Sequence, residues 1–428
     1  MPLPAPVLLI AGPLTAAAAT LFLSRWRRVT ALAGGIFAWW LGGVLAAVHP
    51  GQTAGGGQLF GGDTLAFYGR SLLLTEDVRA LFLFLFAGTG LLCLLSLFYP
   101  AGRRFVPGSL AMMSFLAAAL MVRPFAFGGP LLLVAAAIGA ILIQGDKMGD
   151  TYASWRYLIM MLLAVPPLLV AVWMLGRGQA ALATQASWLL LISFAILLAG
   201  FPFHSWVRPV AAHAPLLVTV LLFGLVQLAV AAFVFGLLGD GSMFQQDTRL
   251  VLMLRWSGAL TAVMGGLLAA AERDRGRMLG YLILLDMGVS FLTLAIPGRD
   301  GYTLAIAAHW GRFGGLLAAV IGLAQLRRYE AQAQAEPPGR ARRPIPWLAL
   351  FAYGCFSLVG LPLTPGFIGR WGLLAAVIHA PPPAPWLASS LLLAMGGGVT
   401  AVLYSLGHWL PDPSLNADQG KNTGQETF

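Results

Sequence analysis

A few ionisable side chains lie within long apolar stretches of this chain, where proton transfer is the chemistry that they could perform. Asp286 follows Leu284 and Leu285, and Arg370 lies in a later apolar run. His309 and Arg312 are three residues apart, on one face of a helix. Burying a charge in a membrane span costs a few kcal/mol, so such residues are functional candidates by default. The alternatives are a static pair of Asp286 with Arg370 or Arg312, and a structural pair of His309 with Arg312.

A second group of polar and helix-breaking residues occupies positions 199–227, which read AGFPFHSWVRPVAAHAPLLVTVLLFGLVQ. His204 and His213 lie here, together with the prolines Pro202, Pro209 and Pro215. A proline breaks a helical hydrogen bond, and in lipid the freed backbone groups must be satisfied by protein or a hydrated cavity. Such breaks mark the ion or substrate path in transporters. A plain kinked helix is the alternative, with both histidines capping backbone groups.

A similar break lies in Gly360–Phe367, which contains Pro362 and Pro365. Two proline-broken segments about five spans apart are typical of paired internal repeats. We therefore predict spans at 186–204 and 210–238 around the first break, and at 346–361 and 366–378 around the second.

The composition indicates an integral membrane protein. Of the 428 residues, 59% are hydrophobic and only 10% are charged, whereas soluble proteins carry about 25% charged residues. The net charge of +10 resides mostly in arginines of short connections, which favours loop charge over nucleic-acid binding. Cys93 and Cys355 lie far apart in apolar runs, with no spacing for a metal site. We find no catalytic triad or cofactor motif, and we expect no catalytic residue, metal or cofactor.

About fourteen apolar segments are long enough for membrane spans, and we predict an all-α polytopic fold with two inverted five-helix repeats. The N-terminus lacks the basic region of a signal peptide and is interpreted as a retained span. The predicted units are N-terminal helices 1–104, a first repeat 105–240, a second repeat 249–380, a C-terminal helix 385–410 and a disordered tail 411–428.

The loops that follow odd-numbered spans carry most of the basic residues, which places them in the cytoplasm of a bacterial-type inner membrane, with both termini outside. These residues include Arg25, Arg27, Arg28, Arg103, Arg104 and the basic run within 327–343.

Three motifs, in order, resemble those of the antiporter-like family, which comprises membrane-arm subunits of complex I (NADH:quinone oxidoreductase) and of Mrp sodium/proton antiporters. Residues 202–206 with 214–219 are similar to PFHxW…AP…V[ST]. Residues 274–288 are similar to DLKRLLAYS…MG, and residues 357–371 to SLAGIPPTAGFIGKF. The arginine-rich 339–344 precedes the third motif, as in the N-type (NuoN-like) branch.

The resemblance implies a proton relay with a Glu on the fifth span, Lys on the seventh and eighth, and Lys or Glu on the twelfth. By register these positions hold residues near Ile141, then Leu197, Gln227 and Arg370. Leucine carries no proton, an amide does not titrate, and arginine is a fixed cation with a pKa above about 12. The pattern predicts that the proton channel of the first half is silent.

The resemblance thus implies a membrane-arm subunit of a complex I-like or related respiratory assembly with an impaired or absent relay. It would couple its neighbours structurally, or form half a channel on Asp286, His309 and Arg370. The expected partners are homologous membrane subunits and an electron-transfer module within the lipid bilayer. Two alternatives remain: a stand-alone or Mrp-type cation/proton antiporter subunit, and a purely structural anchor for an electron-transfer module.

Overall fold

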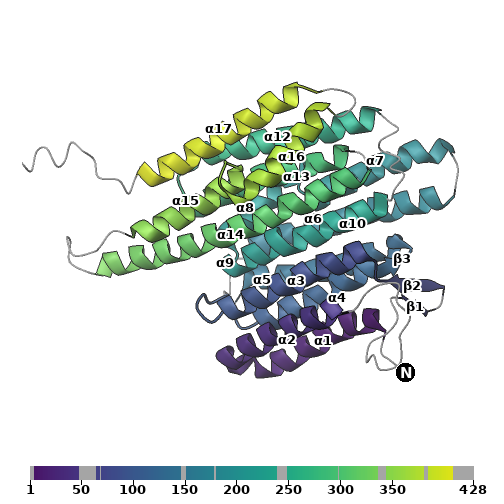
Figure 1. Cartoon of the computed structure of the whole chain (residues 1–428), viewed down its shortest axis with the longest axis horizontal. Coiled ribbons are helices and arrows are strands. Elements are labelled where there is room, and N and C mark those ends of the chain that lie inside the picture. Colours follow the sequence, from purple (N-terminus) through teal and green to yellow (C-terminus); the bar gives the residue numbers. More distant parts are fainter. Residues whose placement is uncertain are drawn as a thin grey trace, which may run out of the picture.

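The computed structural model describes residues 4–47, 64–67, 69–145, 151–177, 180–238, 248–296, 298–335, 344–379 and 384–407. The tail predicted at 411–428, and the arginines at 340–343, lie outside these residues. Within the described ranges, ten helices are long and apolar enough to cross a membrane, and four shorter apolar helices accompany them. The prediction of about fourteen apolar helices in an all-α membrane fold is confirmed (Figure 1).

The first half of the chain is mainly helical. They are α1 (Ala5–Phe22), α2 (Arg27–Ala47), α3 (Glu76–Leu95), α4 (Phe105–Met121), α5 (Gly128–Gln144), α6 (Tyr152–Gly176), α7 (Ala180–Leu197), the 3-10 turn η3 (Phe203–Trp206), α8 (Val207–His213), α9 (Leu216–Val220), the π-helix η4 (Leu221–Val226) and α10 (Gln227–Leu238).

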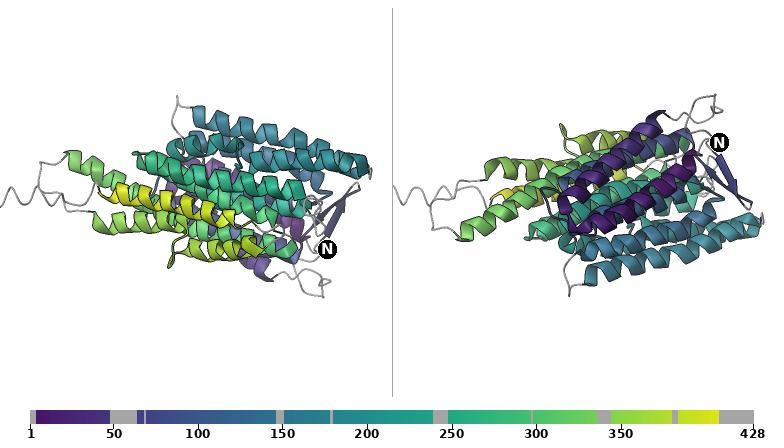
Figure 2. Two further views of the ribbon diagram at one scale, coloured as in Figure 1. Left: turned by 90° about the horizontal axis from the view of Figure 1, so that it is seen from above. Right: turned by 90° about the horizontal axis from the view of Figure 1, so that it is seen from below.

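The second half continues with longer helices. They are α12 (Thr248–Ala271), α13 (Arg275–Leu292), the 3-10 turn η5 (Thr293–Ala295), α14 (Gly298–Ala335), α15 (Ile345–Val359), α16 (Pro365–His379) and α17 (Trp386–Gly407). The views in Figures 1 and 2 agree that α1 and α2 cover one side of the bundle, whereas α12 and α17 cover the opposite side. The segment α9–η4–α10, which is buried throughout 217–234, lies between these layers.

A small antiparallel sheet at one end of the bundle was not anticipated from the sequence. Its strands are β1 (Thr64–Phe67), β2 (Arg70–Leu73) and β3 (Val122–Arg123), in the order β1-β2-β3. Strands of two to four residues are too short to show an alternating apolar pattern, so periodicity could not reveal them. The sheet ties the chain that precedes α3 to the end of α4.

The first predicted break divides one helix into two halves that both pack along α6. The Ser193 hydroxyl of α7 donates to the Ala164 carbonyl at 2.7 Å. Further along, the ring of Trp206 meets that of Tyr157 at 5.4 Å. Later residues of the broken segment therefore contact earlier residues of α6, so α7 and α8 run in the same direction, antiparallel to α6. The two are halves of one discontinuous helix. The seventh span therefore extends past the predicted end at 204 to His213, and the next span begins at Leu216 instead of 210.

The second break has the same form, with α15 and α16 running end to end along α14. A Cβ on Gly322 would lie 2.5 Å from the Phe351 nitrogen of α15, whereas one on Gly369 of α16 would lie 2.7 Å from the Cα of Ala308. The predicted twelfth and thirteenth spans are thus two halves of one discontinuous helix. The sequence separates them because glycine and proline interrupt the apolar run between them.

The two broken helices belong to units of opposite orientation, as inverted repeats require. The starts of α6 and α13 line one cavity, so both helices begin at the same end of the bundle. The chain then crosses along α13, and α14 begins at the opposite end. The partner of the first broken helix, α6, therefore runs antiparallel to the partner of the second, α14.

Close backbone contact between α12 and α13 gives a test of this packing. A Cβ on Gly288 would lie 2.4 Å from the Ala262 nitrogen, whereas one on Gly396 of α17 would meet nothing within 4 Å. We expect Gly288→Ala to destabilise the fold by about 1–3 kcal/mol through overpacking. Gly396→Ala should be neutral or slightly stabilising, because alanine favours helix. The melting temperatures of the detergent-purified variants, followed by tryptophan fluorescence, test this prediction. Equal melting temperatures would contradict the close contact of α12 with α13.

Candidate functional site

The two family positions of the first half, Leu197 and Gln227, are in direct contact. Leu197 is the last residue of α7, and its carbonyl accepts a hydrogen bond of 3.2 Å from the Gln227 side-chain amide. Gln227 is buried and begins α10, directly after the π-helix η4. The amide therefore caps the C-terminal end of a broken helix, whose last carbonyls have no partner within the helix.

Polar side chains of α12 satisfy the backbone further along the first break. The Phe201 nitrogen donates to the Thr261 hydroxyl at 2.7 Å, and the Ser257 hydroxyl donates to the Phe201 carbonyl at 2.9 Å. The backbone groups of Phe201 thus find partners within the protein, as a break among apolar helices requires. Sequence reasoning missed Ser257 and Thr261, although their i, i+4 spacing within an apolar run places them on one helix face.

At the second break, a side-chain donor again caps the end of a half-helix, but here the donor is an arginine. The guanidinium of Arg370 donates through Nη2 to the carbonyl of Leu358, the penultimate residue of α15. The Gly366 nitrogen donates to the Ser357 hydroxyl at 3.0 Å. Gly360 ends α15 at φ = 85°, and a Cβ there would lie 2.2 Å from the Arg370 side chain. In each half, one buried donor thus caps a half-helix.

Arg370 also belongs to a buried cluster of three charges. Asp286 of α13 accepts a hydrogen bond from Arg370 Nη2 at 3.0 Å and another from Arg312 Nε of α14. Arg312 additionally contacts the Ser290 hydroxyl. The side chains of all three charged residues are at most 7% exposed. Two guanidiniums therefore share one carboxylate, and both alternatives for the partner of Asp286 are realised at once. Sequence reasoning missed the role of Ser290.

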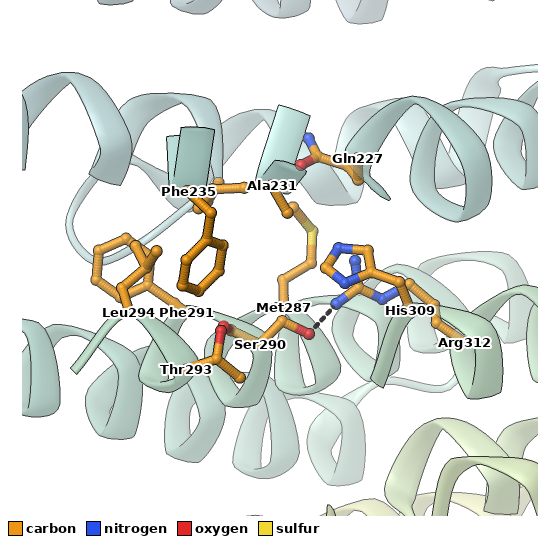
Figure 3. A pocket seen from close by; sticks show the side chains of 11 residues that line it. Gln227, Ala231, Phe235, Met287, Ser290, Phe291, Thr293, Leu294, His309 and Arg312 are labelled. Carbon is orange, nitrogen blue, oxygen red and sulfur yellow. Dashed lines mark hydrogen bonds between the residues drawn. The ribbon is translucent and has the colours of Figure 1, made fainter. Parts of the chain in front are cut away.

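His309 lies one turn before Arg312 but makes no described bond to Asp286. Its Nδ1 lies 2.7 Å from the Ala305 carbonyl, which can only accept, so Nδ1 carries the proton. Its buried Nε2 and the Gln227 Oε1 both lack a hydrogen-bond partner. Both residues line a narrow cavity of about 10 Å³ between α10, α13 and α14 (Figure 3), close to the smallest that holds an ordered water.

The remaining sequence candidates lie elsewhere. His204 and His213 line a separate cavity of about 510 Å³. His204 stacks on Phe201, and His213 Nδ1 lies 2.9 Å from the Pro209 carbonyl. The four prolines mark element boundaries: Pro202 precedes η3, Pro215 precedes α9, Pro362 lies between α15 and α16, and Pro365 begins α16.

Ile141, near which the resemblance places the Glu of the fifth span, is 47% exposed on the outer face of α5. The inward face of α5 there is formed by Ala136, Gly139 and Ala140, which do not titrate.

Arg255 of α12 is fully buried, and sequence reasoning missed it, although it carries the same signal as Asp286, a charge within an apolar run. Among the described residues, no group of three or more His, Cys, Asp or Glu could hold a metal ion.

Comparison with known proteins supplies the context of this site. Residues 79–396 match the family model described as NADH:quinone oxidoreductase/Mrp antiporter, TM. NADH-quinone oxidoreductase subunit N of Thiobacillus denitrificans is 28% identical over 292 residues, 62% of this chain and 56% of that protein. Subunit N of Polaromonas naphthalenivorans is 31% identical over 194 residues, 43% of this chain and 38% of that protein. The chain spans about half the length of the curated relatives it matches.

Solved structures share the fold. A chain of the Mrp complex from Dietzia sp. DQ12-45-1b has a TM-score of 0.76 at 17% identity, over 96% of this chain and 80% of that one. A chain of respiratory complex I from Thermus thermophilus has a TM-score of 0.72 at 22% identity, over 94% of this chain and 87% of that one.

The charge cluster generates a prediction about stability. In Asp286→Asn, two buried guanidiniums lose their counter-ion, and breaking a buried pair in this way costs about 3–5 kcal/mol. Asp77→Asn is the control, because Asp77 pairs with Arg299 at the surface, where a pair contributes about 0–1 kcal/mol. We expect the melting temperature to fall sharply only for Asp286→Asn.

A combined variant separates the charge from the shape of the cluster. Replacing Asp286 and Arg312 by Leu and Arg370 by Met should recover much of the lost stability, since apolar substitutes for a buried ion cluster are tolerated. If Asp286→Asn melts like Asp77→Asn, the cluster contributes little to the fold.

Proposed function

The chain belongs to the NADH:quinone oxidoreductase/Mrp antiporter family, and we propose that it serves as an antiporter-like membrane subunit of a complex I-like or related respiratory assembly. Its helices make it an integral multi-pass membrane protein. Homologous membrane subunits and an electron-transfer module are the proposed partners. This proposal is supported by the relatives named as subunit N of NADH-quinone oxidoreductase and by the fold shared with a chain of complex I.

The proposed orientation places the end of the bundle where α6 and α13 begin in the cytoplasm of a bacterial-type inner membrane. Arg156, Arg208 and Arg277 lie together at this end. Basic residues concentrate on the cytoplasmic side of membrane proteins, which supports this direction.

The family-type proton relay is proposed to be inactive in the first half. The observation that carries this proposal is the hydrogen bond from the Gln227 amide to the Leu197 carbonyl. A relay residue must release and recapture a proton, which a primary amide does not do and a leucine cannot do. In its described position, Gln227 serves as a fixed cap.

In the second half, the cluster is proposed to couple helices rather than to pass protons. Asp286 accepts hydrogen bonds from two arginines at once, and a guanidinium is a fixed cation rather than a proton relay. The cluster joins α13, α14 and α16, so it holds the second broken helix against its neighbours. Transmission of structural change between adjacent subunits is the function that this arrangement supports best.

A second candidate is a subunit of an Mrp-type cation/proton antiporter, favoured by the TM-score of 0.76 with a chain of the Mrp complex. The two assemblies differ in composition. A mass-spectrometric inventory of the complex, purified from native membranes through a tag on this chain, distinguishes them. We expect homologous membrane subunits together with electron-transfer subunits. Antiporter subunits alone would support the second candidate, and recovery of the chain by itself would contradict both.

The proposal for Gln227 predicts separate effects on stability and transport. Gln227→Leu removes one buried hydrogen bond and should cost about 1 kcal/mol of stability. The number of ions moved per electron by the purified assembly should be unchanged. Gln325→Leu is the matched control, since the amide of Gln325 in α14 donates to the hydroxyl of Tyr99, which follows α3, at 3.0 Å. Loss of ion movement in Gln227→Leu, with electron transfer retained, would refute an inactive first half.

A further inference from the structure

The cavity of about 510 Å³ beside the first broken helix has no role in the proposed function. It lies between the start of α6, the segment η3–α8 and the start of α13. We propose that this cavity binds the phosphate group of an anionic phospholipid. The inference goes beyond the proposed function and does not depend on it.

Cationic side chains converge on the cavity from separate elements. Arg156 comes from α6, Arg208 from α8 and Arg277 from α13, and none of the described lining residues is acidic. Two described carboxylates lie beside these arginines: Glu272 is 3.5 Å from Arg208, and Asp274 accepts from the Arg277 backbone nitrogen at 2.8 Å. Neither lines the cavity itself. The excess positive charge and the planar guanidiniums suit a phosphate oxygen pair.

An unsatisfied donor points to an anion rather than to a neutral ligand. Arg156 contacts the Tyr152 hydroxyl through one nitrogen, but its buried Nε has no hydrogen-bond partner among the described residues. The buried Nδ1 of His204 likewise has no partner in the described part of the chain. The start of α6 also lines the cavity and has no described side-chain cap, so the positive end of its dipole favours negative charge there, whereas Asp274 already caps the start of α13.

Part of the cavity wall is apolar, which favours a lipid over free phosphate. Leu268, Ala212 and Leu284 form this part, and Leu284 lies two residues before Asp286 within the membrane-spanning α13. Tyrosines such as Tyr152 and Tyr281, which also line the cavity, are enriched where a membrane meets water. A basic pocket between transmembrane helices at this level is suited to a phospholipid headgroup with its chain lying along the apolar wall.

The test uses the full chain, purified in detergent and stripped of lipid, with native mass spectrometry and thermal melting as readouts. Phosphatidylglycerol should bind and raise the melting temperature, whereas zwitterionic phosphatidylcholine should do neither. In the double variant Arg156→Gln, Arg277→Gln, we expect phosphatidylglycerol to bind about tenfold or more weakly, given the attraction of each basic residue to anionic lipid. The control Arg104→Gln, Arg273→Gln removes two exposed charges outside the cavity lining and should bind normally.

Further arms identify the source of the phosphate and exclude misfolding. Inorganic phosphate alone should not reproduce the shift; if it does so at equal concentration, the lipid assignment is overturned in favour of a free anion. Arg156→Lys, Arg277→Lys should retain part of the binding, because the charge remains. Unchanged phosphatidylglycerol binding in the double glutamine variant would overturn the site. Transport and partner subunits are absent from these measurements, so their outcome leaves the proposed function untouched.

Discussion

The structure depends on one constraint: a helix broken among apolar helices must find hydrogen-bond partners for its freed backbone groups. In each half of the chain, a buried side-chain donor satisfies this constraint by bonding a carbonyl at the C-terminal end of the first half-helix. Gln227 caps Leu197, and Arg370 caps Leu358. The surrounding hydroxyls of Ser257, Thr261 and Ser357 complete the arrangement. These breaks are satisfied structures rather than local disorder.

The same constraint bears on function, because the capping residues occupy the positions at which the family resemblance places titrating side chains. A side chain held by a helix carbonyl in one geometry has little freedom to exchange protons with water. In the second half, Arg370 serves both as a cap and as a counter-ion of Asp286. Stabilisation of the broken helix and neutralisation of the carboxylate therefore depend on one residue.

Much of this was predictable from the sequence, because helix breaks and buried charges leave local signals. The apolar runs predicted the helices, and the prolines predicted both breaks. The packing of helices that are distant in sequence leaves no such local signal. Nothing in the sequence shows that α16 continues α15, since this follows from their shared contacts with α14. The outward direction of Ile141 likewise depends on how α5 is rotated against its neighbours.

The π-helix η4 lies directly before Gln227 and accommodates one more residue per turn than an α-helix would. Each residue in an α-helix turns the following side chain by about 100°. The number of residues between Pro215 and Gln227 thus sets the direction in which the Gln227 side chain points. When relatives are aligned, an insertion or deletion within Leu221–Val226 will bring a different position to face the first break, so equivalence there should be judged from superposed coordinates.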